Sequence, residues 1–390
     1  METFVEEGEN KPKRQKLQEI VEEGEEDRIS ALPDCLLLEI LDRLPSTKHA
    51  IKTGSLSKRW KHVWTSVPSL IFHQYMHRRP DFFSDIDKTL TQCRQSKVKR
   101  FEIDTVYDTQ FESQVNRFIC YAIRCEVEEL NIMLWKAEVK SQLRLDQIFF
   151  NSSCFTRLKV GDCLLNPAGA ITWKNLRSLC LSKGKLDEDL IENILSGSPQ
   201  LETLVLNSYN GCRRLNITSK SVKNLVFSGR VGSEDEFVGN FIEINAPNIL
   251  SLTIRCDLFI PMFLLANVSS LVNAELDYCN CDKRRRKAEK AEMLQEYILN
   301  LLHVKELKIG FNCSKALLYL EDKGFVFPVN LKFPNDWSDR SSSSGDSSDS
   351  DPSDSSSDSD SVDSVSDSSE NDSVSDSSES DSDSDTSSSN

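Results

Sequence analysis

Cysteines and histidines are the residues of this sequence that could most directly bind a metal ion. Cys279 and Cys281 are separated by one residue, and His73 and His77 by three, so each pair could supply two ligands. Neither pair is matched by a second cysteine or histidine pair at zinc-site spacing, and no acidic residue completes a zinc-protease motif. We therefore predict structural or surface roles for these histidines and a repeat-turn position for Cys279. The same prediction covers the remaining histidines, which are His49, His62 and His303.

Enzyme motifs are also missing from the sequence. It contains no phosphate-cradling glycine loop, no nucleophile elbow and no kinase signature. Many of the aspartates lie in a C-terminal tail that cannot hold them in the fixed geometry that catalysis requires. We therefore expect that the chain is not an enzyme, and no metal or cofactor is implied.

The composition fits a protein of a reducing compartment. The 390 residues are 38% hydrophobic and 28% charged, and the twelve cysteines are scattered rather than arranged as a disulfide framework. The sequence contains no run of about eighteen apolar residues, the length needed to cross a membrane. The acidic N-terminus lacks the apolar core of a secretory signal. We expect a soluble intracellular protein that binds neither membranes nor nucleic acid.

The densest apolar pattern lies in residues 27–64. Six apolar residues recur there at the spacing of a broad stripe on one short helix. Pro33 suits the first turn of this helix, and Pro45 ends it. The six residues are Leu32, Leu36, Leu37, Ile40, Leu41 and Leu44.

Two further short segments follow in the same stretch. One runs from Ser46 to Gly54, and Ser57 can cap another, in which three large residues share a helix face: Trp60, Val63 and Trp64. About forty residues cannot bury so many large apolar side chains among themselves. The stretch is therefore predicted to be a docking module that packs against a partner or against the rest of the chain.

The stretch resembles an F-box in the order and spacing of its residues, which read Ile29-Ser30-x-Leu32-Pro33-Asp34-x-Leu36-Leu37-x-x-Ile40-Leu41-x-x-Leu44-Pro45 and then Leu56-Ser57-x-Arg59-Trp60-x-x-x-Trp64. It is most similar to the plant F-box proteins with leucine-rich repeats. Gly54 departs from their pattern, because a small polar residue larger than glycine is more usual at this position. The resemblance implies a three-helix unit that binds the Skp adaptor of cullin-based ubiquitin ligases. It implies an adaptor surface that includes Leu56 and Trp60, which would also pack the module and its junction. The other implied adaptor-binding residues are Leu32, Pro33, Leu36, Ile40, Leu41 and Leu44.

A repeated pattern follows between residues 98 and 309. A triplet of apolar residues, spaced as apolar-x-x-apolar-x-apolar, occurs nine times, with 21 to 33 residues between successive middle positions. Most of these spacings lie in or near the range of leucine-rich repeats, about 20 to 29 residues. The middle residues are Phe101, Leu130, Leu158, Leu179, Leu204, Leu225, Leu252, Ala274 and Leu307.

The repeat predicts one short strand per unit, followed by a return segment, with a core that forms only when units stack. Helical returns are expected at residues 111–124 and 187–195, and loops elsewhere. A helix from the basic cluster 283–287 to Leu302 is expected to carry an apolar stripe of Met293, Tyr297, Ile298, Leu301 and Leu302. Leucine-rich repeats usually carry an Asn or Cys in the turn after the strand. In this sequence Cys163, Cys279 and Asn312 occupy that position.

The predicted fold is α/β: a small three-helix F-box followed by an irregular leucine-rich-repeat solenoid. The expected divisions are a disordered leader (1–26), the F-box (27–75), a linker (76–97), the repeat array with a terminal cap (98–335) and a disordered tail (336–390). In the cap, a short helix at 313–321 and a closing apolar segment at 325–328 would shield the open end of the array.

The leader contains a compact basic cluster that resembles a nuclear import signal, with a solvated charge patch as the alternative. Its residues are Lys11, Lys13, Arg14 and Lys16. Localisation in the nucleus, the cytoplasm or both is expected. The second basic cluster, 283–287, is interpreted as solvated charge.

The tail is nearly all Ser and Asp. Fifteen acidic residues and no basic residue lie between Ser341 and Asn390. The net charge of the whole chain is −15, so the rest of the chain is neutral overall. Such a segment is expected to be disordered and self-repelling. Several serines have an acid three residues later, the pattern that suits an acidophilic kinase of the casein kinase type, and seven of them are taken as phosphorylation candidates. They are Ser348, Ser355, Ser357, Ser364, Ser373, Ser380 and Ser382.

Two functions of different classes fit these features. In the first, implied by the resemblance, the chain is a substrate receptor of a ubiquitin ligase that binds a Skp adaptor, through it a cullin, and an unknown target protein. Candidate target-binding residues point outward from the predicted strands: Glu102, Asn131, Lys159, Val205, Thr253, Glu275 and Lys308. In the second, the acidic tail binds basic proteins such as histones and the repeats are a scaffold. Deleting residues 338–390 should abolish only the second function.

Overall fold

The computed structural model describes residues 29, 32–74, 81–93, 97–136, 142–209, 211, 213–231, 242–258, 263–280 and 287–334. The chain divides into two compact units, Met1–Ser338 and Asp339–Asn390, and every described residue lies in the first unit.

Three short helices form the N-terminal part of this unit: α2 (Asp34–Asp42), α3 (Thr47–Lys52) and α4 (Trp60–Val63). Pro33 stands at the N-cap of α2 in an extended conformation, as its fixed ring allows. The backbone N–H of Trp60 donates a 3.4 Å hydrogen bond to the hydroxyl of Ser57, which starts α4. Single 3₁₀ turns follow α3 (η1, Thr53–Ser55) and α4 (η2, Trp64–Ser66). The predicted three-helix unit is therefore confirmed.

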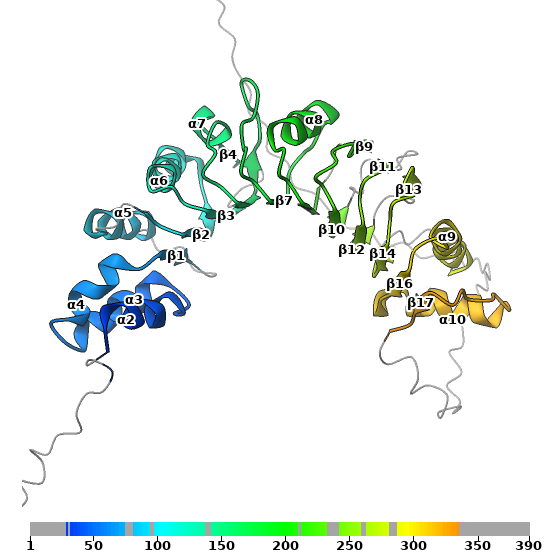
Figure 1. Ribbon diagram of the computed structural model, residues 1–390, viewed down its shortest axis with the longest axis horizontal. Coiled ribbons are helices and arrows are strands. Elements are labelled where there is room, and N and C mark those ends of the chain that lie inside the picture. The colour runs from blue at the N-terminus through cyan, green and yellow to red at the C-terminus, as the bar shows by residue number, and fades with distance from the viewer. Residues whose placement is uncertain are drawn as a thin grey trace, which may run out of the picture. The chain divides into compact units, whose positions relative to one another are not determined.

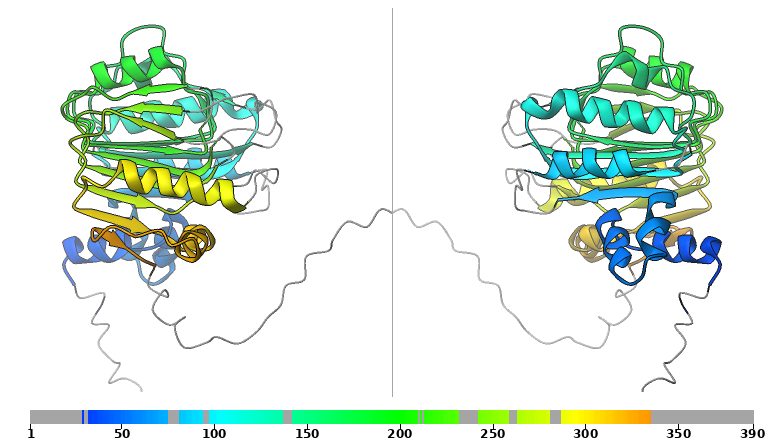
Figure 2. Two further views of the ribbon diagram at one scale, coloured as in Figure 1. Left: turned by 90° about the vertical axis from the view of Figure 1, so that its right-hand side faces the viewer. Right: turned by 90° about the vertical axis from the view of Figure 1, so that its left-hand side faces the viewer.

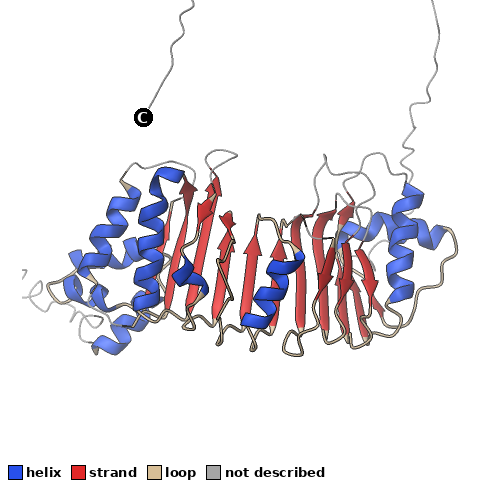
Figure 3. Cartoon of the chain, turned by 90° about the horizontal axis from the view of Figure 1, so that it is seen from above, coloured by secondary structure: helices blue, strands red, loops and turns tan. Residues whose placement is uncertain are grey.

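A parallel sheet of twelve strands forms the rest of the core. Its strands lie side by side and point the same way, as Figure 3 shows. Eleven of them follow one another in chain order, and β15 (Cys279–Asn280) pairs with β12 beside this path. The eleven are β1 (Ser69–His73), β2 (Arg100–Tyr107), β3 (Glu129–Lys136), β5 (Arg157–Gly161), β7 (Ser178–Ser182), β8 (Thr203–Asn207), β10 (Asn224–Val231), β12 (Ser251–Leu258), β14 (Asn273–Leu276), β16 (Glu306–Ile309) and β17 (Leu331–Lys332).

The strand register confirms the predicted repeat. All nine middle residues of the apolar triplets lie in one row across the sheet, each paired with the next. All nine are buried, so the row is the central line of a continuous core. The structure extends the row by one strand at each end, with Leu70 of β1 before it and Leu331 of β17 after it.

The return segments lie on the outer, convex side of the curved sheet (Figure 1). Helical returns were predicted at two places, and both are confirmed by α6 (Glu112–Arg124) and α8 (Glu188–Gly197). Two more predicted helices are present as α9 (Lys287–Asn300) and α10 (Ser314–Asp322). The expectation of loops elsewhere is wrong at α7 (Gln147–Phe150), and a further helix, α5 (Phe82–Gln92), lies in the range predicted as a linker. One-turn 3₁₀ segments precede α6 (η3, Thr109–Phe111) and α10 (η5, Phe311–Cys313).

Short strands replace helices in the other returns. A three-stranded sheet is formed by β9 (Arg214–Asn216), β11 (Ile242–Asn245) and β13 (Phe263–Ala266), and β4 (Leu143–Arg144) pairs with β6 (Cys163–Leu164). Figure 2 shows the stacked strands from each end of the array. The mixture of helices and strands makes the repeats irregular in structure as well as in sequence.

The range predicted as a linker, 76–97, contains the helix α5. Its buried residues Phe82, Phe83 and Ile86 recur with helical spacing, and the Phe83 ring stacks on Phe111 at 4.3 Å between centroids. The apolar side chains therefore give this segment a packed place in the array. The last residues of the predicted F-box range likewise form β1, which pairs with β2.

The C-terminal end of the array differs from the prediction in detail. The expected cap helix is present as α10, and Phe325 and Phe327 of the expected closing segment are partly buried against the core. Phe325 and Phe333 pack edge-on against Phe327, and the last strand of the sheet, β17, follows this segment and was not predicted. In α9 the predicted stripe is buried except for Leu302, which is exposed beyond the helix end, and residues 283–286 lie outside the described residues. Among the described helices, none has the length and apolar character that crossing a membrane requires.

Candidate functional site

Helix α2 presents two different apolar faces. Leu37 and Leu41 point into the core and are almost completely buried, whereas Leu36 and Ile40 are 43% and 42% exposed. The members of each pair are four residues apart, so each pair occupies one face of the helix. The apolar stripe predicted as a single surface is therefore divided between the interior and an outward-facing surface.

This division corrects two residues of the predicted adaptor surface. Leu41 and Trp60 are each only 3% exposed, because both belong to the core of the three-helix unit, and they offer no surface to a partner. Leu56 was expected to pack the module and its junction, but it is 66% exposed in the turn after η1. Three other predicted residues remain accessible in part or fully, Leu32 and Leu44 being half-buried and Pro33 exposed.

An arginine that the sequence interpretation did not single out holds the start of α2. The Nη2 atom of Arg59 donates a 2.6 Å hydrogen bond to the carbonyl oxygen of Leu32. Its Nε and Nη2 atoms also donate to Oδ1 of Asp34 at 3.0 and 2.5 Å. Arg59 therefore fixes the segment Leu32–Asp34 from a position 25 to 27 residues later. Its place in the Leu-Ser-x-Arg-Trp motif was the only signal in the sequence.

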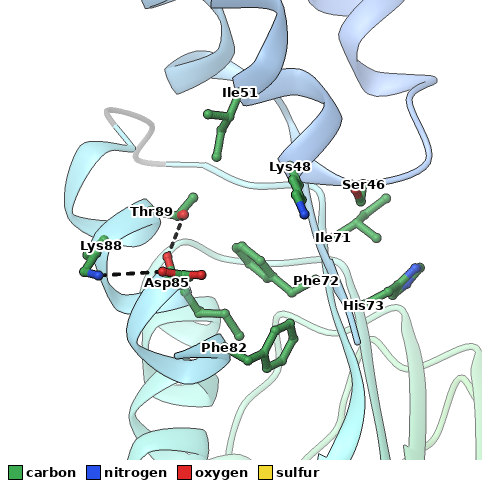
Figure 4. A pocket seen from close by; sticks show the side chains of 11 residues that line it. Ser46, Lys48, Ile51, Ile71, Phe72, His73, Phe82, Asp85, Lys88 and Thr89 are labelled. Carbon is green, nitrogen blue, oxygen red and sulfur yellow. Dashed lines mark hydrogen bonds and ion pairs between the residues drawn. The ribbon is translucent and has the colours of Figure 1, made fainter. Parts of the chain in front are cut away.

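The three-helix unit and the array are directly joined. The buried N–H of Ile71 in β1 donates a 2.7 Å hydrogen bond to the hydroxyl of Thr47 in α3. Beside this bond, α3, β1 and α5 line a pocket of about 270 Å³ (Figure 4). Lys48 and Ile51 come from α3, Phe72 from β1, and Phe82 from α5, so both regions contribute to the wall.

The predicted target-binding residues form one row on the concave side of the sheet. Strand pairing connects them in chain order, with Cys180 and Val226 filling the two positions that the prediction omitted. All seven are exposed or half-buried: Glu102, Asn131, Lys159, Val205, Thr253, Glu275 and Lys308. The sheet therefore brings residues that are more than 200 positions apart in the sequence onto one face. Their role in target binding stays a prediction.

Charged residues of this face are partly neutralised by neighbours. Oε1 of Glu102 lies 3.0 Å from Nε2 of His73, and Oε1 of Glu275 lies 2.5 Å from Nη2 of Arg255. Within the described ranges, Lys159 has no ion-pair partner, and its side chain is exposed. The row thus combines compensated acidic residues with free positive charge.

The described cysteines are free thiols that range from buried to exposed. Burial raises the pKa of the Cys163 thiol far above its ordinary value. This thiol donates a 3.4 Å hydrogen bond to the carbonyl oxygen of Gly161. Cys279 belongs to the strand β15 and is exposed, so its predicted turn position is wrong. The backbone N–H of Asn312 donates a hydrogen bond to Oδ1 of Asp277. In the parts of the chain that the structure describes, no three His, Cys, Asp or Glu side chains are grouped for a metal ion.

Two sets of predicted residues lie outside the described residues. They are the basic cluster of the leader (Lys11, Lys13, Arg14, Lys16) and the serines of the tail between Ser348 and Ser382.

Comparison with protein families gives two matches. The family described as F-box domain matches residues 29–72, the three helices and most of β1. The family described as FBD-associated F-box protein At5g56370, LRR repeats, matches residues 115–269, from α6 to the end of β13.

Individual relatives cover both regions together. The F-box protein At1g49610 of Arabidopsis thaliana is 33% identical over 312 residues, which span 78% of this chain and 74% of the relative. The F-box protein At5g03100 of the same plant is 31% identical over 316 residues, 78% of this chain and 96% of the relative. The F-box/LRR-repeat protein At3g18150 is 32% identical over 81% of this chain and 66% of its own length. The chain therefore belongs to the plant family of F-box proteins with leucine-rich repeats.

Proposed function

We propose that this chain is the substrate-recognition subunit of a Skp-cullin-F-box ubiquitin ligase. Its F-box would bind the Skp-type adaptor, and its repeat array would bind the protein to be ubiquitinated. The observation that carries the proposal is the outward pair Leu36 and Ile40 on a helix whose opposite face is fully packed. Exposed apolar side chains on a folded surface are typical of a protein-binding site.

Further exposed apolar residues of the F-box are candidates for the adaptor surface. In the described part of the F-box, Ile29, Ile51 and Leu56 are also exposed, so five large apolar side chains lie open to solvent. A surface of this kind can supply the apolar centre of an interface, while neighbouring polar residues such as Lys48 form its rim.

The proposed mechanism is positional and non-catalytic. A target bound on the concave face is held at a high effective concentration near the ubiquitin-carrying enzyme that the adaptor and cullin recruit. Such a mechanism requires that target and adaptor be held at a defined distance. The hydrogen bond from Ile71 to Thr47 and the packing of α3 on β1 support it, because they join the adaptor module directly to the first strand of the array.

The basic cluster of the leader supports a role in the nucleus, the cytoplasm or both, and we include nuclear import through Lys11, Lys13, Arg14 and Lys16 in the proposal.

The proposal is tested by co-expressing the full chain with a Skp-type adaptor and measuring whether they co-purify in a one-to-one complex. The variant Leu32→Asp/Pro33→Ala should abolish the complex, while a chain truncated after Trp337 should retain it. The melting temperature of the array in the double variant is the control for folding. A stable complex that survives the double substitution would contradict the proposed adaptor surface, and no complex at all would contradict the ligase function.

A further inference from the structure

An exposed tryptophan stands on the concave face near the end of β3. Trp135 is 45% exposed, whereas the other tryptophans that the structure describes, Trp60, Trp64 and Trp173, are all buried. Its neighbours along the strand alternate, with Leu134 in the core and Met133 on the same side as Trp135. Exposed tryptophans are among the side chains that most often dominate a protein interface.

The indole is fixed by two interactions. Its Nε1–H donates a 2.6 Å hydrogen bond to Oδ1 of Asp104 on the neighbouring strand β2. The ammonium of Lys183 lies over the ring, 3.7 Å from its centroid. The side chain therefore has a defined orientation before any partner arrives, which lowers the entropy lost on binding.

The backbone explains how Lys183 reaches a ring two strands away. Strand β5, which lies between them, ends at Gly161, while β3 continues to Lys136. Four residues directly after or within successive strands adopt left-handed conformations, with φ between 55° and 71°: Asp162, Lys183, Ser208 and Gly229. This conformation costs roughly 1 kcal/mol or more for a residue with a side chain, so its repetition requires support.

That support comes from hydrogen bonds between adjacent strands. The N–H of Asp162 donates to the carbonyl of Ser182 at 3.0 Å, and the N–H of Lys183 donates to the carbonyl of Asn207 at 2.8 Å. The row of left-handed residues changes the direction of the chain at the same point in each strand. From this point the Lys183 side chain extends to the ring of Trp135.

A pocket of about 460 Å³ lies beside Lys183. Its wall includes Lys183, Lys185, Leu164 and Leu165, and Leu164 is exposed. Lys183 therefore contacts the ring of Trp135 and also lines the pocket, which makes the two features continuous. The surface offers apolar contact on the indole and the leucines, with ammonium groups between them.

The lysines of this surface outnumber its aspartates. Asp162 is nearly buried and lies 3.6 Å from Lys183, so it compensates that lysine, while Asp104 keeps its negative charge as it accepts the indole N–H. Across the described ranges, neither Lys159 nor Lys185 has an ion-pair partner, and both are exposed. An incoming cation would meet an indole face that already carries an ammonium, whereas an incoming carboxylate would find unpaired lysines.

We propose that Trp135 and the adjoining pocket are the anchor point for the target, and that they accept an acidic peptide segment carrying an apolar side chain. The apolar side chain packs on Trp135 and the leucines, and the carboxylates pair with Lys159 and Lys185. The proposal rests on the proposed role of the array as the target-binding region. Binding of an isolated peptide does not require the adaptor, so it can fail or succeed independently of the ligase function.

The test is selection of a displayed library of random 12-residue peptides on the purified full chain, followed by affinity measurements on an enriched peptide. Enriched sequences should combine Asp or Glu with Leu, Ile or Phe. Trp135→Ala should weaken the selected peptide at least about 10-fold, and Trp135→Phe should weaken it less. Lys185→Glu should weaken it by about 3- to 10-fold, with a smaller effect at high salt.

Lys332→Glu is the matched control, because Lys332 of β17 is an exposed lysine in the same row of the sheet, seven strands further along the sheet path than Lys159. It should change the affinity less than about 2-fold. Peptides that are basic or uncharged, peptides that bind equally well to Trp135→Ala, or a library that yields no enriched peptide would each overturn the proposal. Unchanged melting temperatures of the variants establish that a loss of binding is not a loss of folding.

Discussion

The hydroxyl of Thr47 in α3 accepts a 2.7 Å hydrogen bond from the backbone N–H of Ile71 in β1. Strand β1 pairs with β2 on one side only, so this N–H would otherwise be an unpaired group at the edge of the sheet. One side chain of the F-box thus satisfies a backbone donor at the first edge of the repeat array. It connects the surface proposed for the adaptor with the surface proposed for the target.

Replacing Thr47 by Val should therefore weaken the connection between the two regions. The substitution keeps the size of the side chain and removes the acceptor, which leaves a buried N–H unsatisfied at a cost of about 1–3 kcal/mol. Urea unfolding of the full chain should show a fall in the free energy of unfolding of this size. Thr47→Ser retains the hydroxyl and should lose less, and equal effects of the two variants would contradict the role of the bond.

Arg59 fixes residues 32–34 through its hydrogen bonds. We therefore expect Arg59→Gln to reduce adaptor affinity by about 5- to 10-fold, although Arg59 contributes no apolar contact. Without its bonds to the Leu32 carbonyl and Asp34, the start of α2 must be ordered during binding. Titration of the adaptor by calorimetry measures the effect. Arg177→Gln is the control, since Arg177 forms an exposed ion pair with Glu202 in the repeat array and not in the F-box, and it should leave the affinity unchanged.

The two faces of α2 predict opposite consequences of similar substitutions. Leu37→Ala removes a fully buried side chain and should lower the free energy of unfolding by about 2–5 kcal/mol. Leu36→Ala removes an exposed side chain and should change it by less than about 0.5 kcal/mol. Chemical unfolding of both variants measures the difference, and similar losses of stability would show that the two leucines are not on opposite faces.

The buried thiol of Cys313 predicts a dependence of stability on alkaline pH. Burial raises its pKa from 9.0 to about 12, with a contribution from the nearby Asp277. Above pH 9 the unfolded chain releases this proton while the folded chain keeps it. The free energy of unfolding should therefore fall as the pH rises from about 9 toward 12, by at most about 1.4 kcal/mol per pH unit from this group.

The matched variant for this effect is Cys313→Ala, which should show a shallower decrease between pH 8.5 and 10.5 in urea unfolding. Its lower absolute stability does not affect the comparison, because only the slopes are compared. Identical slopes for the two proteins would mean that Cys313 titrates normally in the folded state.

The periodic parts of the fold could be predicted from the sequence because their signals are local. Each apolar triplet, such as that around Leu179, marks a strand by itself, and the spacing of the triplets implies stacking. The row of Glu102 and its partners followed from the same alternation. The α5 helix was missed because its apolar residues Phe82, Phe83 and Ile86 are few and lie in a polar segment, and only packing on Phe111 shows their role.

Relationships between distant residues could not be predicted in the same way. The stripe of α2 contains residues for two faces, and sequence spacing alone does not show that Leu41 is buried while Ile40 is exposed. The contact of Lys183 with Trp135 depends on a short β5 and on left-handed residues that are not glycine. Such conformations at Asp162 and Lys183 leave no mark in the composition of the segment.

The most direct test of the account is the affinity of a Skp-type adaptor for the double variant Leu36→Asp/Ile40→Asp, measured against the unchanged chain. Charges on the outward face of α2 should reduce the affinity at least 100-fold, because they would have to lose their water in the apolar centre of the interface. The melting temperature should stay within a few degrees of that of the unchanged chain, since neither side chain is part of the core. Full adaptor affinity in a folded double variant would contradict the central claim that this face of the F-box binds the ligase.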